Sequence, residues 1–170
     1  EADILPHFTG ILCHDHWKPY YQYTGCQHAL CNAHHIRELE RAWEQDEMQW
    51  AKALQSLLTE INKQQIDNPE LDEATKQEYI EKYQQILTQG DIECPPPDEN
   101  SRVKGQRGRL KRTKTRALLE RLRGFQDDVL RFMTDTAVPF TNNQGENDIR
   151  MTKVHQKISG CFRSMQGAQM

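Results

Sequence analysis

Residues 10–39 of this 170-residue chain predict its core elements, and they read GILCHDHWKPYYQYTGCQHALCNAHHIREL. The apolar run at residues 10–13 predicts a short buried strand, which ends at His14-Asp15-His16. Asp15 would therefore stand at the C-terminal end of a strand. After an aromatic-rich turn, residues 26–31 predict a second strand, and Asn32 is a suitable N-cap for a helix after it.

Helical periodicity continues outward from this stretch. Residues 33 to about 66 have apolar side chains three, four and seven apart, which predicts one long helix with Trp43 and Trp50 in the core. The sequence Asp67-Asn68-Pro69 would end this helix and start a second one, which would run to Gly90. We expect the two helices to form an antiparallel hairpin.

Charge is divided unevenly along the chain. Residues 1–100 hold 19 acidic and 7 basic side chains, whereas residues 101–170 hold 6 acidic and 15 basic ones. Residues 102–116 contain eight bases and no acid, and we interpret them as a mobile loop that binds nucleic acid through its phosphates. The alternatives are pairing between the two halves of the chain and a solubilising loop without a partner. The candidate DNA contacts in this loop are Arg102, Lys104, Arg107, Arg109, Lys111 and Arg112.

The C-terminal part again predicts helices. Residues 115–134 have apolar side chains three and four apart, and Val138-Pro139-Phe140 would end that helix. Asn142 and Asn143 would then cap a final helix that carries Glu146. Three bases fall on one side of that helix and are further candidates for phosphate contacts: Arg150, Lys153 and Lys157.

Composition narrows the class of protein. The apolar fraction of 36% is low and the charged fraction of 28% is high, which fits long exposed helices. We find neither an apolar run near the length of a membrane span nor a secretory leader, and we expect a cytoplasmic protein. Five cysteines without regular spacing argue against a disulfide framework.

Asp15 and Glu146 are candidate metal ligands. Cleavage of a phosphodiester with two divalent metals needs carboxylates from separate parts of the chain, and magnesium prefers such oxygen ligands. Each residue also has a structural alternative. Asp15 could begin a turn, and Glu146 has the spacing of a capping box with Asn143. His14 and His16 flank Asp15 and are equally suited to contacts with substrate or metal and to a surface role.

Cys31 and His34, with Cys26 and His35 nearby, are ligands at a spacing that zinc could use. A complete zinc site needs four ligands. We favour the alternative, a buried thiol with a hydrogen-bonded histidine that orients the junction between strand and helix.

Two blocks of the sequence carry a family resemblance. Residues 10–39 and residues 138–168, VPFTNNQGENDIRMTKVHQKISGCFRSMQGA, resemble the two hallmark blocks of the insertion-sequence-66 family of bacterial transposases. The resemblance implies an α/β, α-rich chain with a partial ribonuclease-H-like fold, in which a helical hairpin is inserted before the last catalytic residue. It also implies a metal-binding triad of two aspartates and a glutamate, and a Cys-x-x-His element at Cys31.

The resemblance assigns the catalytic residues individually. Asp15 matches the second aspartate of the triad, and Glu146 matches the glutamate, although Thr141 and Asn147 depart from the family pattern beside it. The first aspartate would lie in strands upstream of Asp15, for which Asp3 is a poor substitute. We therefore expect the first strands and the first aspartate to be missing, and these 170 residues alone neither to cut nor to join DNA.

These observations define the sequence-based prediction. Residues 1–40 would form the partial core with Asp15, residues 41–112 the inserted hairpin and basic loop, and residues 113–170 the core helices with Glu146. The intact parent would cleave and join DNA with Mg²⁺ or Mn²⁺, acting on transposon ends and target DNA as a homo-oligomer in the bacterial cytoplasm. The alternatives are a non-catalytic DNA-binding or regulatory remnant of a transposase and a ribonuclease-H-like nuclease.

Overall fold

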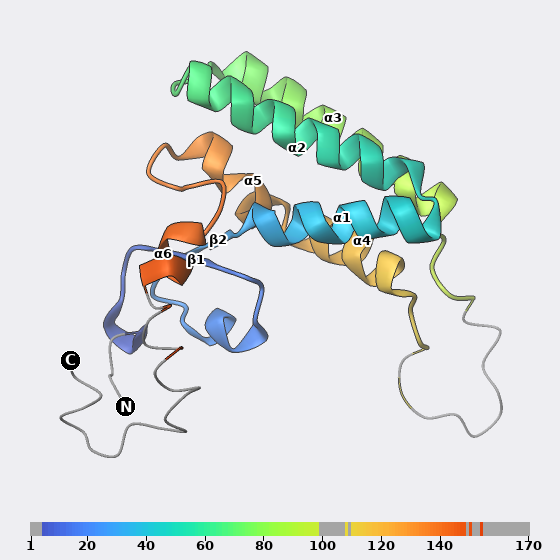
Figure 1. Ribbon diagram of the computed structural model, residues 1–170, viewed down its shortest axis with the longest axis horizontal. Helices are drawn as coiled ribbons and strands as arrows, with labels where there is room; N and C mark the ends of the chain where they lie inside the picture. The colour runs from blue at the N-terminus through green and yellow to red at the C-terminus, as the bar shows by residue number, and fades with distance from the viewer. Residues whose placement is uncertain (1–4, 99–107, 109, 149, 151–153, 155–170) are drawn as a thin grey trace. The chain divides into compact units, whose positions relative to one another are not determined.

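The computed structural model describes residues 5–98, 108, 110–148, 150 and 154 of the chain (Figure 1). Its backbone divides into two compact units, residues 1–140 and residues 141–170. Among the described residues, the first unit contains a small parallel sheet and five α-helices, and the second contains one short α-helix. The α-rich α/β class expected from the sequence is confirmed. Within the described ranges, no helix is long and apolar enough to cross a membrane.

Both predicted strands are present. Strand β1 is Ile11–His14 and strand β2 is Gln27–Leu30, and they pair in parallel, with Ile11 opposite Gln27 and His14 opposite Leu30. A short 3-10 helix, η1 at Leu5–His7, precedes β1, and another, η2 at Lys18–Gln22, lies in the connection between the strands. Because the strands are parallel, both C-terminal ends lie at the same edge of the sheet.

The prediction of one long helix over residues 33 to 66 is wrong, because the chain forms two helices there. Helix α1 is Asn32–Asp46 and helix α2 is Gln49–Asp67. Between them Glu47 adopts a left-handed conformation with φ 55°, and the amide of Met48 donates to the carbonyl of Ala42 at 3.1 Å. This is the hydrogen-bond pattern of a helix C-cap, made here without glycine. The apolar stripe is therefore divided between two helices that pack against each other.

Helix α3, Glu73–Glu93, packs against α2 (Figure 1). Its N-terminus is capped by Asp72, whose side chain accepts a hydrogen bond from the amide of Thr75 at 2.9 Å. The predicted end at Gly90 is wrong, because Gly90 lies inside the helix. A Cβ atom on Gly90 would stand 2.8 Å from Leu119 Cδ1 and 3.1 Å from the ring of Trp50. The glycine is therefore a site of close helix packing and not a helix end.

The predicted helix over residues 115–134 is also two helices, α4 at Lys114–Gly124 and α5 at Gln126–Thr134. The break falls at Phe125, whose φ of −123° and ψ of 31° are not helical. Its aromatic ring packs against the rings of His16 and Tyr21, at centroid distances of 4.4 and 4.9 Å. The helix direction thus changes where the helical layer meets the residues after β1.

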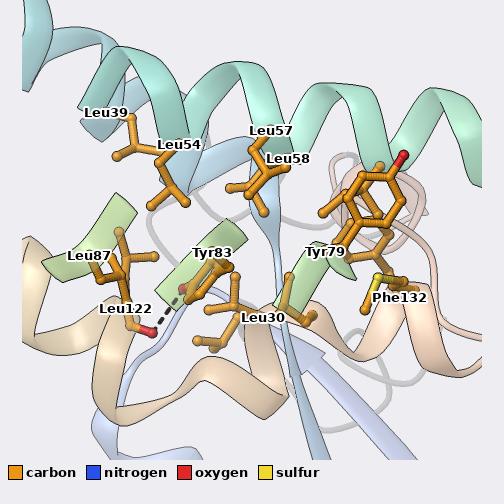
Figure 2. Packing of buried hydrophobic residues seen from close by; sticks show 14 of the residues in the cluster. Leu30, Leu39, Leu54, Leu57, Leu58, Tyr79, Tyr83, Leu87, Leu122 and Phe132 are labelled. Carbon is orange, nitrogen blue, oxygen red and sulfur yellow. Dashed lines mark hydrogen bonds between the residues drawn. The ribbon is translucent and has the colours of Figure 1, made fainter. Parts of the chain in front are cut away.

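Buried side chains from β2 and from helices α1 to α5 form one core (Figure 2). Trp50 is 1% exposed, which confirms its predicted place in the core, and Trp43 is half-buried against it. The hydroxyl of Tyr83 donates to the carbonyl of Leu122 at 2.8 Å, so its one polar group is satisfied inside the core. Each such large side chain contributes about 1.5–3 kcal/mol through burial.

Asn32 connects the end of β2 to the helices. The predicted N-cap role of Asn32 is wrong, because Cys31 occupies the N-cap position and Asn32 is the first helical residue, 1% exposed. Its side-chain amide donates to the carbonyl of Val129 at 3.0 Å, and its side-chain oxygen lies 3.1 Å from Nδ1 of His35. Its backbone amide donates to the carbonyl of Phe140 at 3.0 Å. The side chain is therefore used for tertiary cross-linking and not for capping.

Replacement of Gly90 by alanine should destabilise the chain by about 1–3 kcal/mol, because the added Cβ overpacks the contact with Trp50 and Leu119. Gly124 is the matched control, since a Cβ there meets nothing within 4 Å, and its alanine variant should be neutral or slightly more stable. Urea unfolding of both variants measures the difference. Equal stability of G90A and G124A would contradict this packing role.

Asn32→Asp should cost about 3 kcal/mol or more in the free energy of unfolding, because a carboxylate oxygen would replace the amide that donates to Val129 and would face a buried carbonyl. Asn62→Asp, at a half-exposed position of α2, serves as the control for the same chemical change. Thermal unfolding of the two variants is the measurement. The cross-link is excluded if they unfold at the same temperature.

Candidate functional site

Asp15 directly follows β1, and its side chain is exposed at the C-terminal edge of the sheet. Carboxylate oxygen Oδ1 accepts a hydrogen bond from the backbone amide of Trp17 at 3.2 Å. Asp15 therefore begins a turn, as the alternative interpretation of this residue predicted. The turn uses only one hydrogen bond of the Asp15 carboxylate, which can accept several. Ligands of open α/β sheets bind at this kind of edge, beyond the carboxyl ends of the strands.

The histidines on either side of Asp15 are uncharged at neutral pH. Burial, with smaller contributions from His28 and His16, lowers the pKa of His14 to about 4. Burial also lowers the pKa of His16 to about 4, assisted by the nearby charges of Arg121 and Lys18. Neutral imidazoles place no positive charge directly beside the Asp15 carboxylate.

Aromatic rings hold the turn after Asp15. The hydroxyl of Tyr21 lies 3.1 Å from Nδ1 of His16, and the ring of His16 contacts the ring of Phe125. Burial raises the pKa of the Tyr21 hydroxyl above its ordinary value, so this group stays protonated at neutral pH. The sequence signalled this cluster only through the number of aromatic residues between Trp17 and Tyr23, and Phe125 could not be foreseen as a member.

Arg131 of α5 fixes the neighbouring strand. Its guanidinium donates from Nε to the carbonyl of His28 at 2.6 Å and from Nη1 to the side chain of Gln27 at 3.1 Å. A third bond, from Nη2, reaches Asp128 at 3.3 Å, where burial raises the pKa of the carboxyl despite the nearby arginine. The contacts with β2 could not be predicted from local patterns, because Gln27 and His28 are more than 100 positions from Arg131.

Glu146 lies in helix α6, Asn143–Asp148, of the second unit. The helix begins at Asn143, so Asn142 stands at the N-cap position, and its Oδ1 lies 2.8 Å from the place that a Cβ on Gly145 would occupy. Glu146 is then the fourth helical residue, one position beyond the glutamate of a capping box.

A comparison with known families matches the entire chain. The family model described as Transposase IS66 family covers residues 1–170. The chain belongs to this family. Membership of the IS66 transposase family implies a role in DNA transposition, with DNA as the partner. Neither a curated protein nor a solved structure was found to match it.

The Cys31 element of this IS66 transposase chain lies at the junction between β2 and α1. Cys31 is buried, and His34 has an Nδ1 atom that is buried without a hydrogen-bond partner among the described residues. The hydrogen-bonded histidine of this junction is instead His35, through Asn32. In the described part of the chain, no group of three or more histidine, cysteine or acidic side chains is arranged to hold a metal ion.

Burial raises the pKa of the Cys13 thiol to about 11, and the neighbouring Cys31 adds to this shift. Cys13 is therefore protonated at neutral pH.

The basic segment contains side chains of two kinds. Arg112 pairs with Glu120, with 2.5 Å between Nε and Oε2, and Arg116 is buried in contact with Asp91 and the carbonyl of Cys94. The loop expected up to residue 116 therefore ends earlier, because α4 begins at Lys114. Lys111 and Lys114 are exposed beside a pocket of about 690 Å³ between the ends of α1, α3 and α4.

Of the remaining predicted DNA contacts, one is among the described residues and the others are not. Arg150 is helical and exposed. Outside the described residues lie Arg102, Lys104, Arg107, Arg109, Lys153 and Lys157.

Acid should destabilise the IS66 transposase chain through His35. Burial, with smaller contributions from Arg121, His16 and His34, lowers the pKa of His35 from 6.5 to about 3. At pH values between these two pKa values, His35 is protonated in the unfolded chain but not in the folded chain, so stability falls as the pH falls. His35 should account for a loss of roughly 2 kcal/mol from pH 6.5 to pH 5.

The variant His35→Asn isolates this contribution, because its amide can still donate to Asn32 but does not titrate. Its stability should depend less steeply on pH than that of the unmodified chain, whereas His7→Asn, at an exposed histidine, should not change the slope. Urea unfolding at several pH values measures both. An unchanged slope in H35N would show that His35 is not the acid-sensitive group.

Proposed function

We propose that this chain is part of the catalytic domain of a DDE-type transposase with a ribonuclease-H-like fold, and that Asp15 is the second aspartate of its triad. The observation that carries the proposal is the exposed carboxylate of Asp15 directly after a strand of a parallel pair. The family match over the whole chain supports the same assignment. Residues 41–112, which contain helices α2 and α3, are then the material inserted before the final glutamate.

Asp15 and Glu146 would bind the divalent metal. An exposed oxygen donor between two neutral histidines fits Mg²⁺ or Mn²⁺, which prefer oxygen ligands and keep several of their waters. Bound metal would stabilise the attacking and leaving oxygens of a phosphodiester. The role of Glu146 is taken from the family's motif, Asn-Asn-Gln-Gly-Glu at residues 142–146.

The chain's own residues would position the DNA. In the proposed reaction water first releases a 3′-hydroxyl at the transposon end, and this hydroxyl then attacks target DNA. Exposed bases would neutralise the phosphates, and replacing them should lower the salt dependence of binding. The described candidates are Lys111, Lys114 and Arg150, together with the predicted contacts outside the described residues. We place the reaction in the bacterial cytoplasm, with a homo-oligomer as the active form.

The test uses an intact transposase that contains this sequence and transposon-end DNA with a free 3′-hydroxyl. Asp15→Asn and Glu146→Gln should each lower Mg²⁺-dependent joining by at least about 1,000-fold, because each removes a charged ligand from the metal. Asp67→Asn and Glu70→Gln change exposed acids elsewhere in the same way and should leave the rate unchanged.

The products distinguish the alternative functions. Joined strands support a transposase, whereas hydrolysed strands without joining would indicate a nuclease of the same fold. Full activity of either site variant would contradict the proposed ligands. Salt-dependent DNA binding without any reaction in the unmodified protein would indicate a regulatory remnant.

A further inference from the structure

His14, the residue before Asp15, is a buried polar side chain with a complete set of contacts. It ends β1, is 3% exposed, and its ring lies 5.0 Å from the ring centroids of both Tyr20 and Tyr21. Its Nδ1 accepts a hydrogen bond from the backbone amide of His16 at 3.1 Å. Its Nε2 lies 3.1 Å from Nδ1 of His28 on β2.

These contacts define the tautomer of His14. A backbone amide can only donate, so Nδ1 of His14 must carry a lone pair. A neutral imidazole has one N–H, which is then on Nε2 and donates to Nδ1 of His28. His28 in turn must have its own proton on Nε2. The chain of hydrogen bonds therefore runs in one direction, from the His16 amide through His14 to His28.

The same contacts hold an unfavourable backbone conformation directly after Asp15. His16 has φ 67°, in the left-handed region that residues other than glycine rarely adopt. The bond from its amide to His14 and the contacts of its ring with Tyr21 and Phe125 stabilise this conformation. On the other side of Asp15, the carbonyl of His14 accepts the amide of Cys31 at 2.9 Å. The backbone is thus fixed on both sides of the carboxylate.

We propose that His14 is a positioning residue that directs the Asp15 carboxylate toward the metal by holding the amide of His16, and that His28 selects the tautomer that this requires. The proposal rests on the proposed role of Asp15 as a metal ligand. Groups that orient a metal ligand from behind affect metal affinity or activity by about 10- to 100-fold when they are replaced. His14 does this through the backbone rather than by contact with the carboxylate.

Nitrogen NMR of the histidine rings in the 170-residue chain tests the tautomer directly. We expect the Nε2-protonated form of both His14 and His28 at neutral pH. Protonation of His14 at Nδ1 would overturn the proposal, because that atom could not accept the amide of His16. This measurement needs no substitution and does not depend on the folding of a variant.

Two substitutions at His14 separate its ring atoms. In His14→Asn the side-chain oxygen can replace Nδ1 as the acceptor for His16, whereas in His14→Gln the amide can replace Nε2 as the donor to His28. We expect H14N to keep joining activity in the intact transposase within about threefold. H14Q should need more Mg²⁺ for half-maximal rate and should lose about 10- to 100-fold in activity. His7→Asn is the control and should behave as the unmodified protein.

The outcomes separate this inference from the proposed function. Equal activities of H14N and H14Q, whether high or low, would overturn the positioning role, because packing alone does not distinguish the two ring nitrogens. Full activity of Asp15→Asn would instead refute the proposed function itself. Rescue by asparagine but not by glutamine, in a background where Asp15→Asn is inactive, supports both.

Discussion

The three hydrogen bonds of Asn32 are the constraint on which the arrangement of the first unit depends. Asn32 joins the end of β2 to helix α5 through Val129 and to the segment before α6 through Phe140. It also binds His35 one turn further along α1. A buried amide that lost these partners would keep the cost of desolvation without compensation. Alternative positions of the sheet against the helices are therefore unfavourable.

The position of Asp15 follows from this junction. The amide of Cys31, next to Asn32, donates to the carbonyl of His14, so the end of β2 determines where β1 ends. Arg131 adds a second connection from α5 to β2 at His28. Hydrogen bonds thus fix the backbone next to the Asp15 carboxylate. The proposed phosphodiester chemistry requires this, because metal ligands must be held in place. The exposed sheet edge at Asp15 is therefore connected by hydrogen bonds to the buried junction at Asn32.

Local patterns were sufficient to predict the strands and the position of Asp15. Strand β1 follows Gly10 as a short apolar run, and strand β2 is a short segment after Gly25. The stop at Asp67-Asn68-Pro69 was also correct, because α2 ends at Asp67. These features depend on neighbours in the sequence. Family resemblance supplied the assignment as a transposase, which the match over the whole chain confirmed. The individual roles of Asp15 and Glu146 stay predictions.

Features that depend on distant contacts could not be predicted. The break at Glu47 contains neither glycine nor proline, and the apolar periodicity continues across it. At the second break Gly124 is the last residue of α4, but the periodicity also continues there and predicts a single helix. Gly90 has the signature of a helix end, but it lies inside α3, where Trp50 and Leu119 leave no room for a Cβ atom. Asn32 is a residue type that often caps helices, and only the contact with the carbonyl of Val129 shows that its side chain forms a tertiary hydrogen bond instead.

The most direct test of a metal-binding Asp15 is a change of metal preference. In an intact transposase containing this sequence, Asp15→Cys should abolish joining with Mg²⁺, which binds sulfur poorly, and Mn²⁺ should partly restore it. Asp15→Ala should be inactive with both metals. Activity of the cysteine variant with Mg²⁺, or its inactivity with both metals, would contradict direct coordination by Asp15.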